Sequence, residues 1–422
     1  MEKIPVVILG AGVAGLGAAY RAAELGRHAV VFEARPTAGG LLDNFCIDGF
    51  RFDHSVHLSF ATEKLVREIF DKTPYYSHPS DSYCFETDRW LKHPVQNNLY
   101  PLHPNERMTL IKSFLGRPEI LGGTDYESWL RHQYGDAISE RYPIRYTKKY
   151  WDTLPSELST TWIGNRMRRA EFEEILLGSL TDDTPNHYYT KEMRYPKIGG
   201  YKTFIQPLID SAVIRYSHLC ISIDTDLRQI HFDNGCVIQY EQLVSTLPLP
   251  ELAAITKPMS ESILSCAEKL KATSIDLISI GFKKKLIKDL WFYIYDEDIY
   301  ASRAYSPSVK SPDNAPKGCS SLQFEVYSRG KESRFRPEDL KENTLEALRK
   351  MRISFEDEII FMDHRRITYG NVIFDQGMEE NRNRVLDWCS SVGISSCGRF
   401  GSWDYFWSNQ SFISGYNSLD SV

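Results

Sequence analysis

The first 33 residues constrain the fold more than any other stretch of this chain. An apolar run at residues 4–9 precedes Gly-Ala-Gly-Val-Ala-Gly at positions 10–15, and an alanine-rich amphipathic segment leads to a second apolar run that ends at Glu33. The apolar runs predict two strands, and the segment between them predicts a helix. A unit of this kind binds the pyrophosphate of a dinucleotide at the N-terminus of its helix.

Each glycine of this motif has a physical role. Gly10 permits the tight turn from strand to helix, Gly12 lets backbone N–H groups approach a pyrophosphate, and Gly15 lets the helix pack on the strand. Glu33 lies 23 positions after Gly10, where a carboxylate accepts a hydrogen bond from a ribose 2′-hydroxyl and repels a 2′-phosphate. The alternative is a glycine-rich turn without a ligand, but the strand, the helix and the spaced acid agree with one another.

The composition favours a small-molecule partner. Lys and Arg total 50 against 56 Asp and Glu, which gives a net charge of −6, so no polybasic field is present to bind nucleic acid or an anionic membrane. No stretch approaches the roughly 20 apolar residues that a membrane span needs, and the chain enters its first strand without the pattern of a signal peptide. We therefore expect a cytoplasmic protein without membrane insertion.

Cysteine usage agrees with a reducing compartment. The 8 cysteines are scattered and form no Cys-x-x-Cys pair, so we expect reduced, mostly buried thiols, with neither a disulfide framework nor a metal site.

The rest of the chain predicts two further layers. Residues 105–115 and 124–134 read as helices, the second of them ending at Gly135, while residues 229–232 and 237–240 flank an Asn-Gly turn that is typical of a hairpin. Strands are expected at residues 83–90, 275–282, 291–295, 321–327 and 358–362, with a helix at 337–351. The predicted fold class is α/β: a Rossmann-like dinucleotide-binding domain, a helical insert, and a second, mainly antiparallel sheet domain.

We expect these domains to be built from discontinuous segments. The Rossmann-like domain is assigned residues 1–88, 195–255 and 385–422, the helical insert residues 99–194, and the sheet domain residues 89–98 and 256–384.

The residues that follow Glu33 carry a family resemblance. Ala34-Arg35-Pro36-Thr37-Ala38-Gly39-Gly40-Leu41-Leu42, continuing to Asp53, resembles the FAD-binding two-dinucleotide fold of the amine oxidase and sugar-nucleotide mutase superfamily. This resemblance implies FAD rather than NAD.

Further segments are similar to the flavin-dependent UDP-galactopyranose mutases, more to the eukaryotic branch than to the bacterial one. They are residues 52–57, 90–98 and 150–166, the stretch Gly398-Arg399-Phe400-Gly401-Ser402-Trp403-Asp404-Tyr405 with Asn409-Gln410, and more weakly Trp291, Tyr293 and Arg303.

The resemblance assigns site residues along the whole chain. The positions implied to bind FAD are Gly10, Ala11, Gly12, Val13, Ala14, Gly15, Glu33, Ala34, Gly39, Gly40, Leu41, Leu42, Ser55, Val56, His57, Leu227, Gly398, Arg399, Asn409 and Gln410. Those implied to bind substrate are His93, Val95, Gln96, Trp162, Arg166, Tyr293, Arg303, Arg399 and Tyr405. His57, Arg303 and Arg399 are the implied catalytic residues.

The chemistry of two of these residues fits a sugar nucleotide. The planar guanidinium groups of Arg303 and Arg399 can each hold phosphate oxygens through two hydrogen bonds and never lose their charge. The competing interpretation is structural, because most arginines form weak surface ion pairs and most Trp and Tyr residues fill the core.

The chain also departs from the mutase pattern, which leaves its substrate open. Ser55-Val56 replaces the Gly-Gly of the flavin loop, where glycine gives the backbone its freedom. His93 and Val95 replace the Tyr and Phe expected around a uracil, Asp404 replaces a basic residue, and Asn371 with Phe374 stand in place of a phosphate-binding Tyr-x-x-Pro.

The function implied by the resemblance is a non-redox use of FAD in surface glycan biosynthesis. A nucleotide-diphosphate sugar would exchange its pyranose and furanose rings through an adduct at N5 of the reduced flavin. The source of reduction, for which NAD(P)H is one candidate, and the oligomeric state are left open. Two alternatives remain: an FAD oxidoreductase of the amine oxidase or protoporphyrinogen oxidase type, and an inactive flavin or sugar-nucleotide binding subunit.

Overall fold

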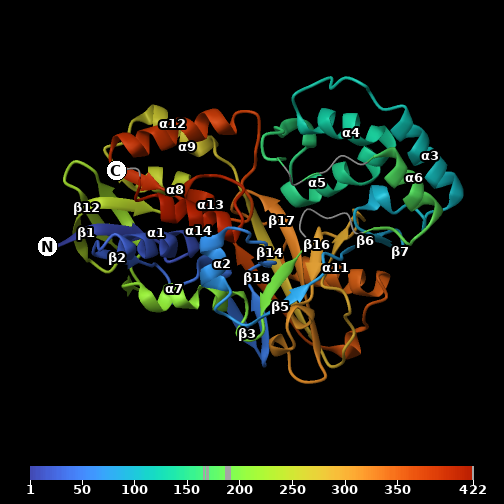
Figure 1. The fold of residues 1–422 in the computed structure, drawn as a ribbon, viewed down its shortest axis with the longest axis horizontal. Helices are drawn as coiled ribbons and strands as arrows, with labels where there is room; N and C mark the ends of the chain where they lie inside the picture. Colours follow the sequence, from blue (N-terminus) through green and yellow to red (C-terminus); the bar gives the residue numbers. More distant parts are fainter. Residues whose placement is uncertain (165–166, 168–170, 186–191, 421–422) are drawn as a thin grey trace.

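The computed structural model describes residues 1–164, 167, 171–185 and 192–420. Two sheets and a helical layer surround the centre of the molecule (Figure 1), and the first sheet with its helices occupies one end. The predicted fold class is confirmed.

The first sheet has eight strands in the order β13-β10-β11-β12-β1-β2-β9, with β19 also paired to β12. Its strands are β1 (Glu2–Leu9), β2 (Ala29–Phe32), β9 (Ile214–Arg215), β10 (Cys220–Asp224), β11 (Gln229–Phe232), β12 (Val237–Ser245), β13 (Thr256–Lys257) and β19 (Ile394–Ser396). β1 runs parallel to both β2 and β12, and β11 pairs antiparallel with β12. The hairpin predicted around the Asn-Gly turn is therefore confirmed.

Alternating side chains bury both faces of this sheet. Val7 and Val30 pack in one core with residues of α8 (Leu249–Ile255), α9 (Glu261–Lys269) and α12 (Met378–Ser391), while Val6, Ile8 and Val31 pack with α1 (Val13–Glu24) on the other face. The continuous apolar runs of the sequence follow from this burial, because parallel strands between helices have no solvent face.

The last long helix lies directly against the first. A Cβ atom added at Gly415 of α14 (Ser408–Asn417) would come within 1.8 Å of the Ala14 carbonyl oxygen of α1. Glycine therefore allows the two backbones to touch, which brings the C-terminal segment, including α13 (Gly398–Gly401), beside the glycine-rich turn.

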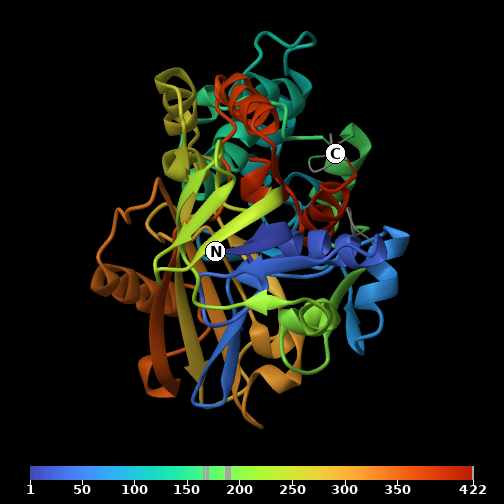
Figure 2. The ribbon, with the colours of Figure 1, turned by 90° about the vertical axis from the view of Figure 1, so that its left-hand side faces the viewer.

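The second sheet has seven strands in the order β18-β14-β17-β16-β15-β6-β7. They are β6 (Tyr83–Glu86), β7 (Arg89–Lys92), β14 (Thr273–Phe282), β15 (Trp291–Ile294), β16 (Arg303–Tyr305), β17 (Ser320–Arg329) and β18 (Ile359–Ile367). Every pair is antiparallel except β15 with β6. Helix α11 (Pro337–Lys350) packs on β14 and β18, and Figure 2 shows the long strands of this sheet extending beyond the first sheet.

Smaller elements connect the two sheets. They are β3 (Asn44–Ile47) paired with β4 (Phe50–Asp53), β5 (Tyr75–His78) paired with β8 (Met193–Pro196), α2 (Lys64–Phe70), α7 (Gln206–Ser211), α10 (Pro307–Lys310), and the 3₁₀ turns η1 (Gly40–Leu42), η2 (Val95–Asn97), η3 (Pro155–Glu157), η4 (Tyr201–Ile205), η5 (Pro312–Asn314) and η6 (Glu356–Glu358).

The helical insert stands above one end of the second sheet (Figure 1). It contains α3 (Pro104–Leu115), α4 (Tyr126–Arg141), α5 (Pro143–Trp151) and α6 (Phe172–Leu180). Arg141 fastens it to the sheet, because its Nε and Nη2 donate to the two carboxylate oxygens of the buried Glu86 at 2.6 and 2.9 Å. The helix expected to end at Gly135 does end there: Gly135 has non-helical backbone angles with φ of +74°, and a second helical segment of α4 follows directly after this kink.

The sheets divide the chain differently from the predicted boundaries. β6 belongs to the seven-stranded sheet, so the boundary at residue 88 falls inside the β6–β7 hairpin. β13 belongs to the eight-stranded sheet and α9 packs on α12, so residues 256–269 and α12 lie with the Rossmann-like side. The alternating pattern at residues 83–90 hid a two-residue turn at Thr87 and Asp88, both of which have positive φ.

Among the helices of the described residues, none combines the length and the apolar character needed to cross a membrane.

Candidate functional site

One cavity of about 1170 Å³ lies where both sheets, the helical insert and the C-terminal segment meet. Most residues assigned to a site by the sequence line this cavity. They are Gly10, Gly12, Val13, Ala14, Glu33, Gly39, Gly40, Leu41, Leu42, Ser55, Val56, His57, His93, Gln96, Trp162, Tyr293, Arg303, Gly398, Arg399 and Tyr405. The structure thus brings together positions as far apart in the chain as Gly10 and Tyr405.

The dinucleotide end of the cavity is built from backbone. A Cβ atom added at Gly12 would meet no protein atom within 4 Å, whereas one at Gly15 would come within 1.9 Å of the Gly10 carbonyl oxygen. Gly12 therefore borders open space at the N-terminus of α1, where a phosphate gains from the helix dipole and N–H groups. Glu33 accepts from the N–H groups of Ala11 (2.7 Å) and Arg35 (2.9 Å), and its carboxylate retains acceptor capacity for a ribose hydroxyl.

A short loop after β4 forms the next part of the wall. Ser55 has a φ of +84°, which is unusual for a residue with a side chain. The Nδ1 atom of His57 lies 3.0 Å from the Ser55 carbonyl oxygen, and because a carbonyl only accepts, Nδ1 carries the proton. Burial lowers the pKa of His57 to about 4, so near neutral pH its Nε2 atom is an acceptor.

A buried carboxylate on β17 holds this loop and an arginine together. The Oγ of Ser55 and the N–H of Val56 donate to one oxygen of Glu325, at 2.6 and 2.8 Å. The other oxygen accepts from Arg303 Nε and from the Tyr327 hydroxyl. Burial alone would raise the pKa of Glu325, but the charge of Arg303 and these hydrogen bonds outweigh it and lower the pKa.

The sheet register explains that ion pair. Arg303 of β16 lies directly opposite Glu325 of β17 and opposite Tyr293 of β15. Neighbouring residues of adjacent strands project from the same face, so Arg303 and Tyr293 both reach the cavity, while Glu325 is buried against Arg303.

Arg399 reaches the same cavity from the C-terminal segment. Its Nη1 donates to the Phe406 carbonyl (2.7 Å) and its Nη2 donates to Asn371 Oδ1 (2.8 Å). Among the described residues no carboxylate lies within ion-pair distance of this guanidinium group, whereas Arg303 is paired with Glu325. Arg399 therefore leaves a positive charge in the cavity for an anionic ligand.

Aromatic side chains form the wall on the side of the helical insert. The ring of His93 lies 4.7 Å from that of Tyr293, and Trp162 contacts Tyr126, Trp151 and Tyr405. Burial lowers the pKa of His93 to about 4, so this ring is neutral. Together with Gln96 these residues provide flat, uncharged surfaces and an amide, as a nucleobase requires.

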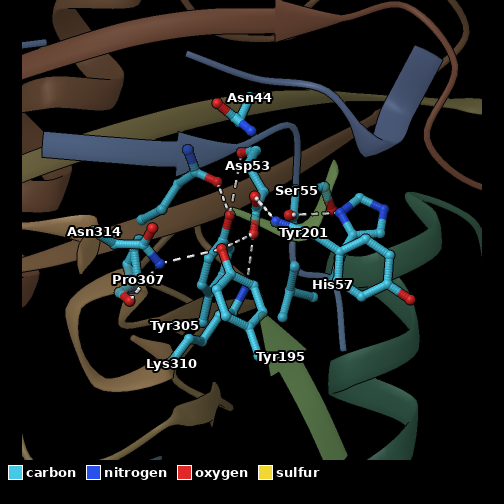
Figure 3. Close-up of polar contacts among 12 residues, drawn as sticks. Asn44, Asp53, Ser55, His57, Tyr195, Tyr201, Tyr305, Pro307, Lys310 and Asn314 are labelled. Carbon is cyan, nitrogen blue, oxygen red and sulfur yellow. Dashed lines mark hydrogen bonds and ion pairs between the residues drawn. The ribbon is translucent and has the colours of Figure 1, made fainter. Parts of the chain in front are cut away.

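A buried ion pair lies behind the His57 loop (Figure 3). Asp53 accepts from the Tyr195 hydroxyl (2.8 Å) and the Tyr201 N–H (3.1 Å), and Lys310 Nζ lies 3.4 Å from it. Burial lowers the pKa of Lys310 to about 8, and the rings of Tyr195 and Tyr305 flank its ammonium group. This network joins β4 to α10, so it fixes the loop between the two sheets.

Several assigned residues do not line the cavity. Ala11 and Gly15 are packed behind the glycine-rich turn, Ala34 is exposed, and Val95 is buried in the core. Asn409 donates to Glu63, and the side chain of Gln410 caps α14. Arg166 lies outside the described residues.

The assignment of Leu227 to the flavin site does not match the structure. Leu227 is 57% exposed in the turn between β10 and β11. The start of β10 faces the cavity instead, through Leu219 and Cys220. Residue type alone does not show which end of a hairpin lies beside the cavity. The turn that contains Leu227 is at the far end of this hairpin from Leu219 and Cys220.

Comparison with protein families identifies two regions. Residues 8–73 match the model of an NAD(P)-binding Rossmann-like domain, and residues 124–366, more than half of the chain, match that of the flavin-containing amine oxidoreductases. The chain belongs to the flavin-containing amine oxidoreductase family.

Solved structures of a mutase and an oxidase superimpose on almost the whole of this chain. A reduced UDP-galactopyranose mutase superimposes with a TM-score of 0.92 at 26% identity, over 99% of this chain and 95% of the other. Cyclohexylamine oxidase from Brevibacterium oxydans IH-35A shares the fold, with a TM-score of 0.69 at 13% identity over 99% and 98% of the two chains. The resemblance to a UDP-galactopyranose mutase-like flavoprotein is confirmed, and the residues of the cradle at Gly12 and Glu33 fit a flavin dinucleotide.

Curated relatives are more distant. A 15-cis-phytoene desaturase of Solanum lycopersicum is 26% identical over 188 residues, which are 37% of this chain and 32% of the relative. The enzyme of the same name from Glycine max is 22% identical over 320 residues, 68% of this chain and 55% of the relative. The chain thus spans between a third and about half of the length of these desaturases.

Sequence reasoning missed three contributors to the site of this flavoprotein family member. Glu325 could have been found as an acid at an inward position of an otherwise apolar strand. Tyr146 and Tyr150 line the cavity from α5, and their spacing of four residues marks one helix face.

Proposed function

We propose that this protein is an FAD-dependent mutase that interconverts the pyranose and furanose rings of a nucleotide-diphosphate sugar. The observation that carries the proposal is the presence of Arg303 and Arg399 in the cavity that also contains the glycine cradle and the His57 loop. The superposition with a reduced UDP-galactopyranose mutase extends over 95% of that protein's length and supports the same reaction class.

The bound FAD, in its reduced form, supplies the nucleophile of the reaction. The chain supplies charge and geometry. Arg399, with its uncompensated charge, holds the leaving diphosphate, and Arg303, oriented by Glu325, supports it through charge-assisted hydrogen bonds. Water is kept away by aromatic side chains that include Trp162 of the helical insert and Tyr405 of the C-terminal segment.

His57 has a positioning role in this proposal. Its Nδ1–H is committed to the Ser55 carbonyl, so Nε2 can only accept a hydrogen bond while the ring is neutral. An acceptor at this wall favours a ligand that presents an N–H or O–H group. Because its pKa is lowered to about 4, this property persists across the physiological pH range.

The decisive experiment uses purified protein loaded with FAD and reduced chemically under anaerobic conditions. A panel of nucleoside-diphosphate sugars that varies base and sugar is incubated with it, and products are separated by chromatography. We expect a ring isomer to form over many turnovers with no net oxidation of the flavin. The same assay with NADPH or NADH in place of the chemical reductant shows whether either nucleotide can reduce the flavin.

The main competing function is an FAD-dependent oxidoreductase. It is favoured by the match to 15-cis-phytoene desaturases and by the fold shared with cyclohexylamine oxidase. Such an enzyme would oxidise its substrate with stoichiometric consumption of oxygen or another acceptor and would not need Arg399. Binding of a sugar nucleotide without turnover would indicate the third alternative, an inactive binding subunit. Such a subunit would contribute to surface glycan biosynthesis only by binding the nucleotide sugar.

A further inference from the structure

Tyr150 contacts Arg303 directly and is connected to Arg399 through Tyr405. It lies on α5, is 8% exposed, and lines the cavity. The guanidinium carbon of Arg303 lies 5.2 Å from the centre of its ring, and that of Arg399 lies 4.7 Å from the ring of Tyr405. The hydroxyl groups of the two tyrosines are 2.8 Å apart.

These four side chains come from three separate parts of the molecule. Arg303 belongs to the seven-stranded sheet, Tyr150 to the helical insert, and Tyr405 with Arg399 to the C-terminal segment. The helical insert therefore completes the cationic part of the cavity through one phenol. Each guanidinium group lies over its own ring, and the hydroxyl contact joins the two rings.

The hydroxyl pair restricts where the protons can go. Two phenols in contact share one hydrogen bond, so one proton lies between the oxygens and the other points elsewhere. Asn371 Oδ1 lies 3.4 Å from the Tyr150 hydroxyl and already accepts from Arg399 at 2.8 Å. When an anion lies beside Arg399, Tyr150 can donate to the Tyr405 oxygen, and Tyr405 can then donate to the anion.

We infer that Tyr150 is a positioning residue that favours a diphosphate over a single phosphate, by keeping the hydroxyl of Tyr405 as a donor towards the ligand. The inference rests on the proposed function, because it assigns a further residue to the same site. Two cations separated by a donor match two adjoining anionic groups, whereas a single phosphate can be held by Arg399 alone.

The test measures binding of inorganic pyrophosphate and of inorganic phosphate to the FAD-loaded protein by titration calorimetry. We expect the wild type to prefer pyrophosphate. Tyr150→Phe keeps the ring and removes the donor, so pyrophosphate affinity should fall roughly tenfold while phosphate affinity changes less than about twofold. The matched control is Tyr240→Phe, which removes a buried hydroxyl on β12, outside the cavity, and should leave the preference intact.

A double-mutant cycle separates this role from a structural one. Tyr150→Phe and Tyr405→Phe should be strongly non-additive in pyrophosphate affinity, because either change removes the same relay. Equal pyrophosphate preference in wild type and Tyr150→Phe overturns the inference alone. If Tyr150→Phe does not fold, a retained preference in Tyr405→Phe overturns it equally, and a wild type that binds neither anion overturns the proposed function as well.

Discussion

The two ends of the cavity are built in different ways. At the dinucleotide end, a turn of six residues and one acid 18 positions later supply the cradle, mostly through backbone N–H groups. At the other end, Arg303, Glu325 and Arg399 come from distant segments, and their side chains carry the charge. A site made of local backbone tolerates almost no added volume, while a site made of side chains depends on how each charge is compensated.

The largest effect is expected where that compensation is broken. Arg303→Met leaves the fully buried Glu325 without its cation, which should destabilise the fold by about 3–5 kcal/mol. Arg399→Met removes donors from Asn371 and Phe406 but orphans no carboxylate among the described residues, so about 1–3 kcal/mol is expected. Urea unfolding of both variants measures the difference.

The rescue variant for this comparison is Arg303→Met combined with Glu325→Gln. It should recover part of the stability lost by Arg303→Met, because the buried group is then neutral. Equal losses of unfolding free energy in Arg303→Met and Arg399→Met would contradict this prediction. They would show that pairing with the buried Glu325 does not distinguish Arg303 from Arg399.

The backbone end can be dissected with two alanines. Gly15→Ala places a Cβ against the Gly10 carbonyl and should lower the unfolding free energy of the apoprotein by about 1–3 kcal/mol. Gly12→Ala places its Cβ in open space, and the residue has a φ of −75°, so the apoprotein should lose less than about 0.5 kcal/mol. The same Cβ occupies the phosphate position, so we expect Gly12→Ala to bind FAD at least tenfold more weakly.

Fluorescence quenching of FAD measures that affinity, and urea unfolding measures the stability. Gly12→Ala with undiminished FAD binding would contradict the placement of the pyrophosphate at the N-terminus of α1.

This contrast also explains which features the sequence could predict. The first strand–helix–strand unit and the hairpin at the Asn-Gly turn follow from spacing within a few dozen residues, and the structure has both. The pairing of Arg303 with Glu325 depends on the register of two strands that are joined by 14 residues of other structure, which no local pattern contains. Resemblance to a family supplied Arg303, but it could not supply its partner.

Turns inside apparently continuous patterns were the second limit. Residues 83–90 alternate like one strand, yet the positive φ at Thr87 and Asp88 folds them into a hairpin. Tyr150 could not be placed for a related reason: its helix face borders the cavity because the insert docks on the sheet, where Arg141 contacts Glu86, a residue 55 positions earlier in the chain.

The pH dependence of stability compares two buried histidines, His57 at the flavin loop and His93 at the aromatic wall. Burial lowers the pKa of each from about 6.5 to about 4. Between these values the unfolded chain binds protons that the folded chain does not, so stability falls as the pH is lowered through that interval. Between pH 7.5 and pH 5 each histidine should reduce the unfolding free energy by about 2 kcal/mol.

Urea unfolding at the two pH values tests this expectation in His57→Gln and His93→Gln, with the exposed His28→Gln as the control substitution. Each of the first two variants should lose the contribution of its own histidine, about 2 kcal/mol over this interval, and keep the contribution of the other. A pH dependence of stability in His57→Gln equal to that of the wild type would mean that this ring is hydrated in the folded protein, and the wall that we assign to the flavin would then be open to water.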